Sequence, residues 1–271
     1  MPNSEEPELE TIRLDWAAEG VAVATLDRPD RLNAMTMGMF ADLEELAWHI
    51  GNLDAARVLI LTGAGQGFCA GYDLADAAEL PGLSPMAMLA RQEQAARALS
   101  AVRAVRVPVI AAVNGAVAGG GLALALAADI RIASSAAKFN AAFVRIGLSA
   151  GDLGTSWLLP RLVGPALAAE IAYTGRFVEA AEAERIGLVN KVVPAQDLLT
   201  EAVAMAMLIC ANSPAGVQLS KRALQANMEV TSYAAALELE NRGQALLTRG
   251  EDLPEALEAF RAKRPPVFTG R

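Results

Sequence analysis

Three consecutive glycines at positions 119–121 are the residues of this sequence whose arrangement most directly suggests chemistry. They follow a short apolar stretch, 109–113, that is typical of a buried strand, and they open an apolar stretch that predicts a helix over about 120–128. A helix that begins at glycines directs unpaired N–H groups and its positive dipole end toward a ligand, and glycine lets the ligand come close. The same residues could also form a strand, a turn and a helix that only pack in the core.

A serine nucleophile is a second possibility, because residues 147–151 read Gly-Leu-Ser-Ala-Gly and match the nucleophile elbow G-x-S-x-G by letter. An elbow serine needs a general base, and α/β-hydrolases place their histidine after it. The chain has one histidine, His49, and it lies far upstream of Ser149. The serine match is therefore interpreted as accidental, and acid–base steps are expected to fall to carboxylates or water.

A dinucleotide site is a third possibility, since Gly63, Gly65 and Gly67 follow a predicted strand in the manner of the G-x-G-x-x-G fingerprint. The third glycine comes one position too early, and residues 68–71 do not continue as a helix. We therefore reject this interpretation.

The elements that must position these residues are strands and helices that alternate as far as about residue 195. From Pro165 onward the pattern is helix after helix, with one strand-like interruption at 189–193. We expect an α/β fold with a core over residues 1–195 and a helical C-terminal region over residues 196–271. The expected strands are 11–16, 21–27, 57–62, 109–113 and 130–133, and the further expected helices before Pro165 are one capped by Thr36, one over 84–105 and one over 152–162.

Composition narrows the classes of partner. The 271 residues are 54% hydrophobic and carry a formal net charge of −8, which disfavours nucleic acid and anionic membrane surfaces as partners. Cys69 and Cys210 stand alone, so neither a zinc site nor a disulfide scaffold is expected. The acidic residues 1–10 lack the features of a signal peptide, and the glycines at 119–121 would break a membrane-spanning helix. The sequence predicts a cytoplasmic protein with no membrane partner and no metal.

Two glycine-containing segments that each follow a predicted strand, together with Arg28-Pro29 and Leu32-Asn33-Ala34, resemble the enoyl-CoA hydratase/isomerase (crotonase) superfamily. The order and spacing of the motifs carry the resemblance, which extends over about 12–268. The two segments are 67–73 (Gly-Phe-Cys-Ala-Gly-Tyr-Asp) and 114–121 (Asn-Gly-Ala-Val-Ala-Gly-Gly-Gly), and the later matches are 147–148, 159–164, 174–176, Ala180, Ala183 and 187–189.

The resemblance implies a crotonase-like spiral of ββα units with a C-terminal helical trimerisation region, assembled as a homotrimer or homohexamer. It also implies an acyl-CoA substrate, with coenzyme A as part of the substrate and no separate cofactor. The N–H groups of Ala70 and Gly120 are expected to form an oxyanion hole around the thioester carbonyl. Such fixed main-chain donors stabilise an enolate as it forms.

The resemblance further implies residues that contact the substrate. Phe260 and Lys263 are expected to reach coenzyme A from a neighbouring subunit, although a solvated lysine is an equally open interpretation. The positions that match the lining of the pantetheine and adenine pocket are Arg31, Leu32, Ala34, Tyr72, Asp73 and Leu74.

Two positions depart from the hydratase pattern. Typical hydratases of the superfamily carry one glutamate two residues after the glycine triplet and another four residues before the Gly-Leu pair, where this sequence has Ala123 and Phe143. Neither side chain can take or give a proton, so ordinary hydration of a double bond is in doubt. Both residues are expected to line a more apolar acyl pocket.

One carboxylate remains at a position where related isomerases and dehalogenases carry a working acid, and it is Asp152. Small and apolar neighbours should raise the pKa of this carboxyl by desolvation, which suits acid–base catalysis. Asp152 could instead cap the following helix, and both roles can coexist. Isomerisation of a double bond is the favoured reaction, and a non-catalytic acyl-CoA-binding protein is the alternative. Asp73 and Asp129 are interpreted as a loop-ordering and a structural residue.

Overall fold

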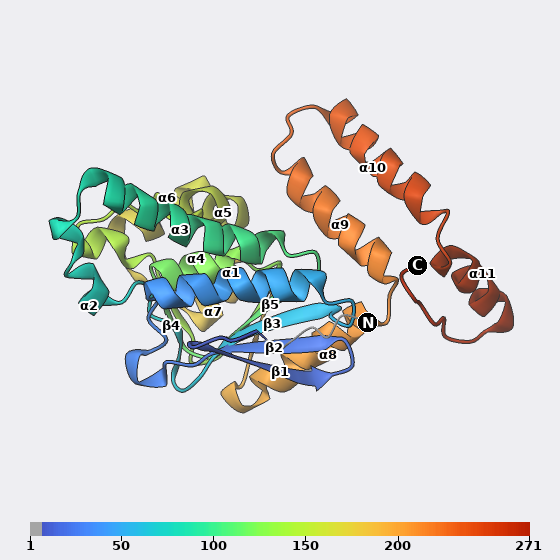
Figure 1. The fold of residues 1–271 in the computed structure, drawn as a ribbon, viewed down its shortest axis with the longest axis horizontal. Helices are drawn as coiled ribbons and strands as arrows, with labels where there is room; N and C mark the ends of the chain where they lie inside the picture. Colours follow the sequence, from blue (N-terminus) through green and yellow to red (C-terminus); the bar gives the residue numbers. More distant parts are fainter. Residues whose placement is uncertain (1–6) are drawn as a thin grey trace.

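The computed structural model of the chain describes residues 7–271 as two β-sheets covered by helices (Figure 1). The acidic segment at positions 1–6, on which part of the signal-peptide argument rests, lies outside the described residues. The larger sheet has six strands in the order β1-β2-β3-β5-β7-β10, antiparallel between β1 and β2 and parallel elsewhere. Its strands are β1 (Ile12–Ala18), β2 (Val21–Leu26), β3 (Val58–Gly63), β5 (Val109–Val113), β7 (Ile130–Ser134) and β10 (Lys191–Val193).

The smaller sheet consists of four three-residue strands in the order β4-β6-β8-β9. Its strands are β4 (Gly67–Cys69), β6 (Ala116–Ala118), β8 (Lys138–Asn140) and β9 (Phe177–Glu179). The strands β4, β6 and β8 each follow a strand of the larger sheet and precede a helical segment, which makes the repeated ββα unit of the crotonase-like spiral. The sequence predicts no strand at these segments, because three residues are too few to show a strand period.

The helices on one side of the larger sheet surround the glycine-rich segment. α1 (Met37–Asn52) begins at Thr36, whose hydroxyl accepts a hydrogen bond from the Met39 N–H at 3.2 Å, as expected for a cap. α3 (Pro85–Ala104) lies along α1 (Figure 1). Every residue of α4 (Gly120–Ala127) is buried. The remaining helices of this part are α2 (Leu74–Ala77), α5 (Thr155–Val163), α6 (Pro165–Thr174) and α7 (Ala180–Arg185).

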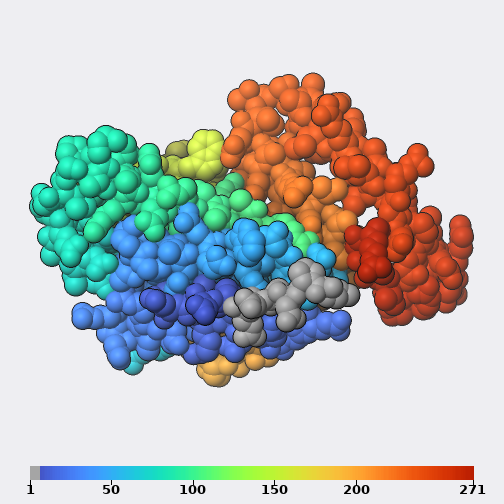
Figure 2. Space-filling view, in the orientation of Figure 1, coloured from blue at the N-terminus to red at the C-terminus, as the bar shows by residue number. Residues whose placement is uncertain are grey.

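The chain beyond residue 196 is helical, and its helices pack in two different places. α8 (Leu198–Cys210) buries Leu198, Ala202 and Ala206 against the larger sheet and so belongs to the core. α9 (Pro214–Asn227), α10 (Tyr233–Leu247) and α11 (Asp252–Ala262) form a separate lobe, drawn in orange to red in Figure 2. The packing boundary therefore falls between α8 and α9.

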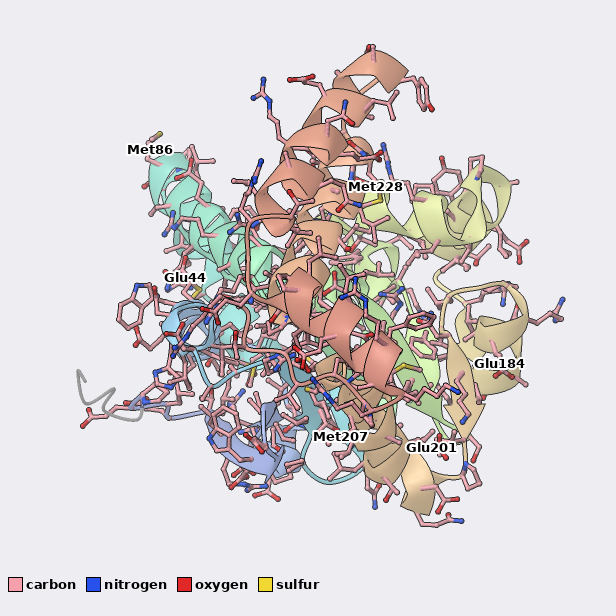
Figure 3. All side chains as sticks on the ribbon, turned by 90° about the vertical axis from the view of Figure 1, so that its right-hand side faces the viewer. Glu44, Met86, Glu184, Glu201, Met207 and Met228 are labelled. Atoms are coloured by element: carbon pink, nitrogen blue, oxygen red, sulfur yellow. The ribbon has the colours of Figure 1, made fainter. Side chains whose placement is uncertain are left out.

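An ion pair between the buried Lys221 and the half-buried Asp129 joins this lobe to the core. The Lys221 Nζ on α9 lies 2.8 Å from the Asp129 Oδ2 and donates to the Val107 carbonyl at 2.9 Å. Asp129 also accepts a hydrogen bond from the Val109 N–H at 2.8 Å. Asp129 thus holds both the start of β5 and α9, which is the structural role expected for it. Figure 3 views the molecule from the side of this lobe, with Met228 labelled just beyond the end of α9.

Among residues 7–271 no single helix is both long and apolar enough to cross a bilayer, whereas the two helices within 195–227, bent by 105°, reach that length and apolarity together. The cytoplasmic location stays a prediction.

Candidate active site

The two glycine-containing segments lie against each other at Gly71 and Gly120. A Cβ atom on Gly71 would lie 2.6 Å from the Ala118 carbonyl oxygen and 3.2 Å from the Gly120 nitrogen, and Gly71 has a φ of +89°. Only glycine fits such a close approach in this backbone conformation. Two main-chain hydrogen bonds fix the segment from its other side: the Met35 N–H donates to the Gly71 carbonyl at 2.7 Å, and the Asp73 N–H donates to the Met35 carbonyl at 2.9 Å.

α4 begins at Gly120 without a side-chain cap. The first helical hydrogen bond runs from the Ala123 N–H to the Gly119 carbonyl at 3.1 Å, so the amide of Gly120 precedes it and is not used by the helix. A Cβ on Gly120 would lie 3.2 Å from the Met35 sulfur and 3.4 Å from the Leu153 Cδ1. Gly120 therefore presents an unused amide in an apolar surrounding.

The Ala70 amide is engaged elsewhere, so the prediction that it is the second donor is wrong. Its N–H donates to the Leu32 carbonyl at 2.9 Å. This carbonyl is brought close by a turn in which Leu32 and Asn33 have φ values of +48° and +56°. An amide that already donates to a carbonyl cannot also serve as a free donor for a thioester oxygen.

The next candidate along the chain is the Tyr72 amide. Within residues 7–271, the Tyr72 N–H donates to no main-chain acceptor. The carbonyl of Gly71 and the N–H of Asp73 both face Met35, and alternation along an extended segment directs the Tyr72 N–H to the opposite side. No feature of the sequence distinguishes the Tyr72 amide from the Ala70 amide, because the difference depends on the contact with Leu32.

Asp152 lies in the loop before α5, half-buried, and its Oδ1 accepts a hydrogen bond from the Gln92 Nε2 on α3. Burial raises the pKa of the Asp152 carboxyl, and the hydrogen bonds from the Gln92 amide and the Leu153 N–H oppose that rise. The side chain does not cap α5, whose N-cap residue is Gly154. The next residue, Leu153, has its Cδ1 3.4 Å from where a Cβ on Gly120 would lie, so the backbone that carries Asp152 passes near the start of α4.

Ala123 and Phe143 are two buried apolar residues near the glycines at 119–121. Ala123 is fully buried in the first turn of α4, and Phe143, on a 3₁₀ turn over Ala142–Ile146, is 5% exposed. The Phe143 Cε1 would lie 3.8 Å from a Cβ on Gly119. An aromatic ring and a methyl group are thus the side chains at the two positions that the family resemblance compares with the glutamates of hydratases.

The family model described as "Enoyl-CoA hydratase/isomerase" matches residues 17–271. The chain belongs to the enoyl-CoA hydratase/isomerase family. It is 43% identical over 256 residues to "Probable enoyl-CoA hydratase EchA12" of Mycobacterium tuberculosis, covering 92% of this chain and 89% of that one. It is 38% identical over 259 residues to the 1,2-epoxyphenylacetyl-CoA isomerase of Escherichia coli, covering 95% and 98%. The crystal structure of an enoyl-CoA hydratase from Bacillus anthracis superposes with a TM-score of 0.92 at 33% identity, over 97% of this chain and 100% of that one.

The positions that the family resemblance assigns to the pantetheine and adenine pocket fall into two groups that lie together. The bridge between Met35 and Tyr72 brings residues 31–34 beside residues 72–74. The Asp73 Oδ1 accepts from the Ala75 N–H at 3.0 Å, and its Oδ2 pairs with the Arg28 guanidinium at 3.0 Å. The Ala75 N–H is the main cause that lowers the pKa of Asp73. This side chain orders the loop, as expected.

The other members of these groups differ in exposure. Leu32 is 43% exposed and Leu74 is 68% exposed, whereas Ala34 is buried, and Arg31 lies at the surface. The Tyr72 ring stacks on Phe40 with centroids 6.2 Å apart. The exposed leucines lie in the two segments that the bridge brings side by side, so apolar surface borders this loop.

Phe260 and Lys263 lie far from the other family positions within one chain. Phe260 is 84% exposed on α11, and Lys263 ends that helix with a φ of +54°. α11 and α2 lie at opposite ends of the molecule in Figure 1.

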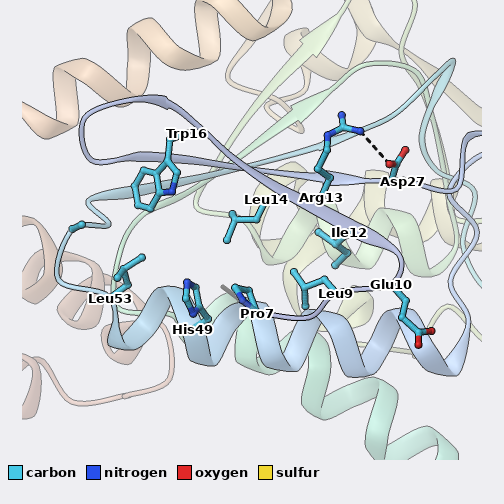
Figure 4. A pocket seen from close by; sticks show the side chains of 11 residues that line it. Pro7, Leu9, Glu10, Ile12, Arg13, Leu14, Trp16, Asp27, His49 and Leu53 are labelled. Carbon is cyan, nitrogen blue, oxygen red and sulfur yellow. Dashed lines mark hydrogen bonds and ion pairs between the residues drawn. The ribbon is translucent and has the colours of Figure 1, made fainter. Parts of the chain in front are cut away.

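The rejected motifs have structural explanations. Gly67 begins strand β4 rather than a helix, which agrees with rejecting the dinucleotide site. The Ser149 hydroxyl accepts a hydrogen bond from the Gly151 N–H at 2.9 Å, within its own loop. His49 is buried on α1 and lines a cavity of about 590 Å³ beside β1, where Trp16 and Leu53 also lie (Figure 4). Ser149 does not line that cavity, so His49 and Ser149 do not form a catalytic pair.

Proposed function

We propose that this protein isomerises the double bond of an enoyl-CoA thioester, with Asp152 as the residue that moves the proton. The observation that carries the proposal is the half-buried carboxylate of Asp152, which precedes Leu153 near the start of α4. The two positions that the family resemblance compares with hydratase glutamates hold the apolar residues Ala123 and Phe143. The likeness to the 1,2-epoxyphenylacetyl-CoA isomerase of Escherichia coli supports isomerisation of a coenzyme A thioester in general.

The reaction divides into two proton transfers. The ionised Asp152 carboxylate takes a proton from the carbon between the thioester and the double bond, and the electron pair moves onto the thioester oxygen as an enolate. The amides of Tyr72 and Gly120 are proposed to donate to that oxygen, and such preorganised donors stabilise the charge without reorganisation. The protonated Asp152 then returns the proton to the far carbon of the conjugated system. No water is consumed, so one acid–base residue suffices.

The resemblance assigns residues to the coenzyme A part of the substrate, and we propose that they bind it in two places. The loops with Arg31, Leu32, Ala34, Tyr72, Asp73 and Leu74 receive the pantetheine and adenine of the chain's own substrate. Phe260 and Lys263 reach coenzyme A in a neighbouring subunit of a homotrimer or homohexamer. The exposure of Phe260 and the distance of α11 from the loops support contact between subunits.

The experiment that tests the reaction supplies the purified protein with 2-enoyl-CoA and 3-enoyl-CoA and separates the products by chromatography. We expect interconversion of the two and little 3-hydroxyacyl-CoA. The variant Asp152→Asn is expected to lose about 10²- to 10⁴-fold in kcat, as is usual when a general base is removed. Hydration as the main reaction, or an Asp152→Asn variant as active as the parent, contradicts the proposal. Binding without turnover on either substrate contradicts it as well.

A further inference from the structure

Gln92 reaches the carboxylate of Asp152 across a gap of 60 residues in the sequence. It stands on α3, in the stretch of that helix where Ala95, Ala98 and Leu99 are buried against the core. Gln92 is itself half-buried. The hydrogen bond therefore connects the loop before α5 to a long, packed helix. The Gln92 side chain fixes where the Asp152 Oδ1 lies.

Among the described residues, Gln92 is the only side chain that hydrogen-bonds to Asp152. It takes Oδ1, so Oδ2 accepts from no side chain. A carboxamide is a suitable partner for a carboxylate that must exchange a proton, because its N–H donates to the ionised form and the amide has no proton that titrates in this range. The causes that set the pKa of Asp152 are burial, the Gln92 amide and the Leu153 N–H, and no charged group is among them.

We propose that Gln92 is a positioning residue that holds Asp152 by Oδ1 and leaves Oδ2 as the oxygen that exchanges the proton with the acyl group. This inference rests on the proposed function of Asp152. Holding one oxygen restricts rotation of the carboxylate about its terminal bond. The carboxylate therefore loses this rotational freedom before the substrate binds, and not during the reaction. The same hydrogen bond favours the ionised carboxylate and so opposes the rise in the pKa of Asp152 that burial causes.

The test replaces the amide with an apolar side chain of similar length, Gln92→Met. The kcat for enoyl-CoA isomerisation is expected to fall about tenfold while KM changes by less than about twofold, because Gln92 acts through Asp152 and not on the substrate. The acidic limb of the kcat/KM profile is expected to move up by about one pH unit, since the hydrogen bond to the ionised form is lost.

The matched control is Gln94→Met, on the same helix and also half-buried. In the described part of the chain the Gln94 side chain makes no hydrogen bond, so this variant is expected to keep the parent's kcat and pH profile. Equal melting temperatures of the two variants would show that neither unfolds α3.

Two outcomes separate this inference from the proposed function. If Asp152→Asn abolishes isomerisation but Gln92→Met keeps the parental kcat and acidic limb, the positioning role is wrong and the proposed function stands. If Asp152→Asn is as active as the parent, the proposed function is wrong, whatever Gln92→Met does. A fall in kcat without any movement of the acidic limb also overturns the positioning role, because a purely structural disturbance would produce it.

Discussion

At the scale of single residues, Asp152 illustrates a conflict between catalysis and stability. Its carboxyl must be ionised to act as a base, yet it lies half-buried, where the charged form is disfavoured and its pKa is raised. The folded protein therefore binds the proton on Asp152 more tightly than the unfolded chain does. The contribution of this residue to the free energy of unfolding must then fall as pH rises through the raised pKa.

The stability of the variant Asp152→Asn follows from that sign. At neutral pH the parent carries a half-buried charge that asparagine lacks, so the variant is expected to melt about 1–2 °C higher than the parent. Below the ordinary pKa of 3.8 the carboxyl is protonated in both the folded and the unfolded chain, and the difference should vanish. Calorimetric melting curves at a series of pH values measure this. A variant that melts lower than the parent at neutral pH would mean that the Gln92 hydrogen bond outweighs burial.

The pH dependence of the parent enzyme is a second consequence at this scale. Since the base must be ionised, kcat/KM is expected to fall as pH is lowered through the pKa of Asp152, which lies above the ordinary value of 3.8. Initial rates with 3-enoyl-CoA, measured in buffers of constant ionic strength, give the position of this limb. A profile that stays flat down to the ordinary value would contradict the raised pKa.

At the scale of elements, the site depends on how closely α4 approaches β4. A Cβ on Gly121 would lie 2.1 Å from the Cys69 carbonyl oxygen and 2.8 Å from the Cys69 Cβ. Both partners belong to a buried strand, so neither can give way cheaply. Glycine at this position therefore lets the helix that carries the Gly120 amide lie directly on the strand that leads to Tyr72.

The variant Gly121→Ala tests this packing. Its methyl group must push α4 away from β4, and overpacking of this kind destabilises proteins by about 1–3 kcal/mol. Activity should fall more than stability alone explains, because the amides of Gly120 and Tyr72 move apart. The control is Gly243→Ala on α10, where a Cβ meets nothing within 4 Å and the helix should gain up to about 1 kcal/mol. Denaturant titration and kcat/KM of both variants measure these effects, and parental values for Gly121→Ala would contradict the argument.

The sequence predicted those helices and strands that are long enough to show an apolar run or a periodic apolar pattern. The strand β5 matches its predicted range, and α4 ends one residue before its predicted end. Both lie in one uncharged, apolar run, in which the glycines mark where the strand ends and the helix begins. The smaller sheet was missed, since its strands have three residues each. Matching to the family predicted Asp152 as the acid–base residue, and that assignment stays a prediction. The same matching chose Ala70 as a donor, which is wrong because a hydrogen bond to the Leu32 carbonyl decides which amide is free. Nothing in the sequence marks Gln92, whose role depends on a hydrogen bond between distant segments.

At the scale of the whole molecule, the lobe of α9–α11 has a disproportionate share of exposed apolar side chains. Tyr233, Leu246 and Phe260 are 79%, 68% and 84% exposed. Polar contacts fasten the lobe to the core: Lys221 pairs with Asp129, and the Gln225 Nε2 donates to the Arg103 carbonyl at 3.0 Å. An extended lobe held in this way suits contact with other subunits, and it would bring Lys263 to a substrate that the chain's own loops do not bind.

The variant Lys263→Ala tests whether that lysine binds coenzyme A. Only coenzyme A, and not a pantetheine thioester, carries the nucleotide phosphates that a lysine would pair with. We expect KM to rise about three- to tenfold for the enoyl-CoA, because one charged contact with the substrate is lost. The KM for the enoyl-pantetheine should stay unchanged. Lys191→Ala, which removes an exposed pair with Glu201, serves as the control and should change neither KM. If Lys263→Ala loses affinity equally for both thioesters, Lys263 acts on subunit assembly instead. Light scattering of Lys263→Ala would then show smaller oligomers than those of the parent. If neither KM changes, the lysine is part of a solvated face and the neighbouring-subunit contact must be made by other residues.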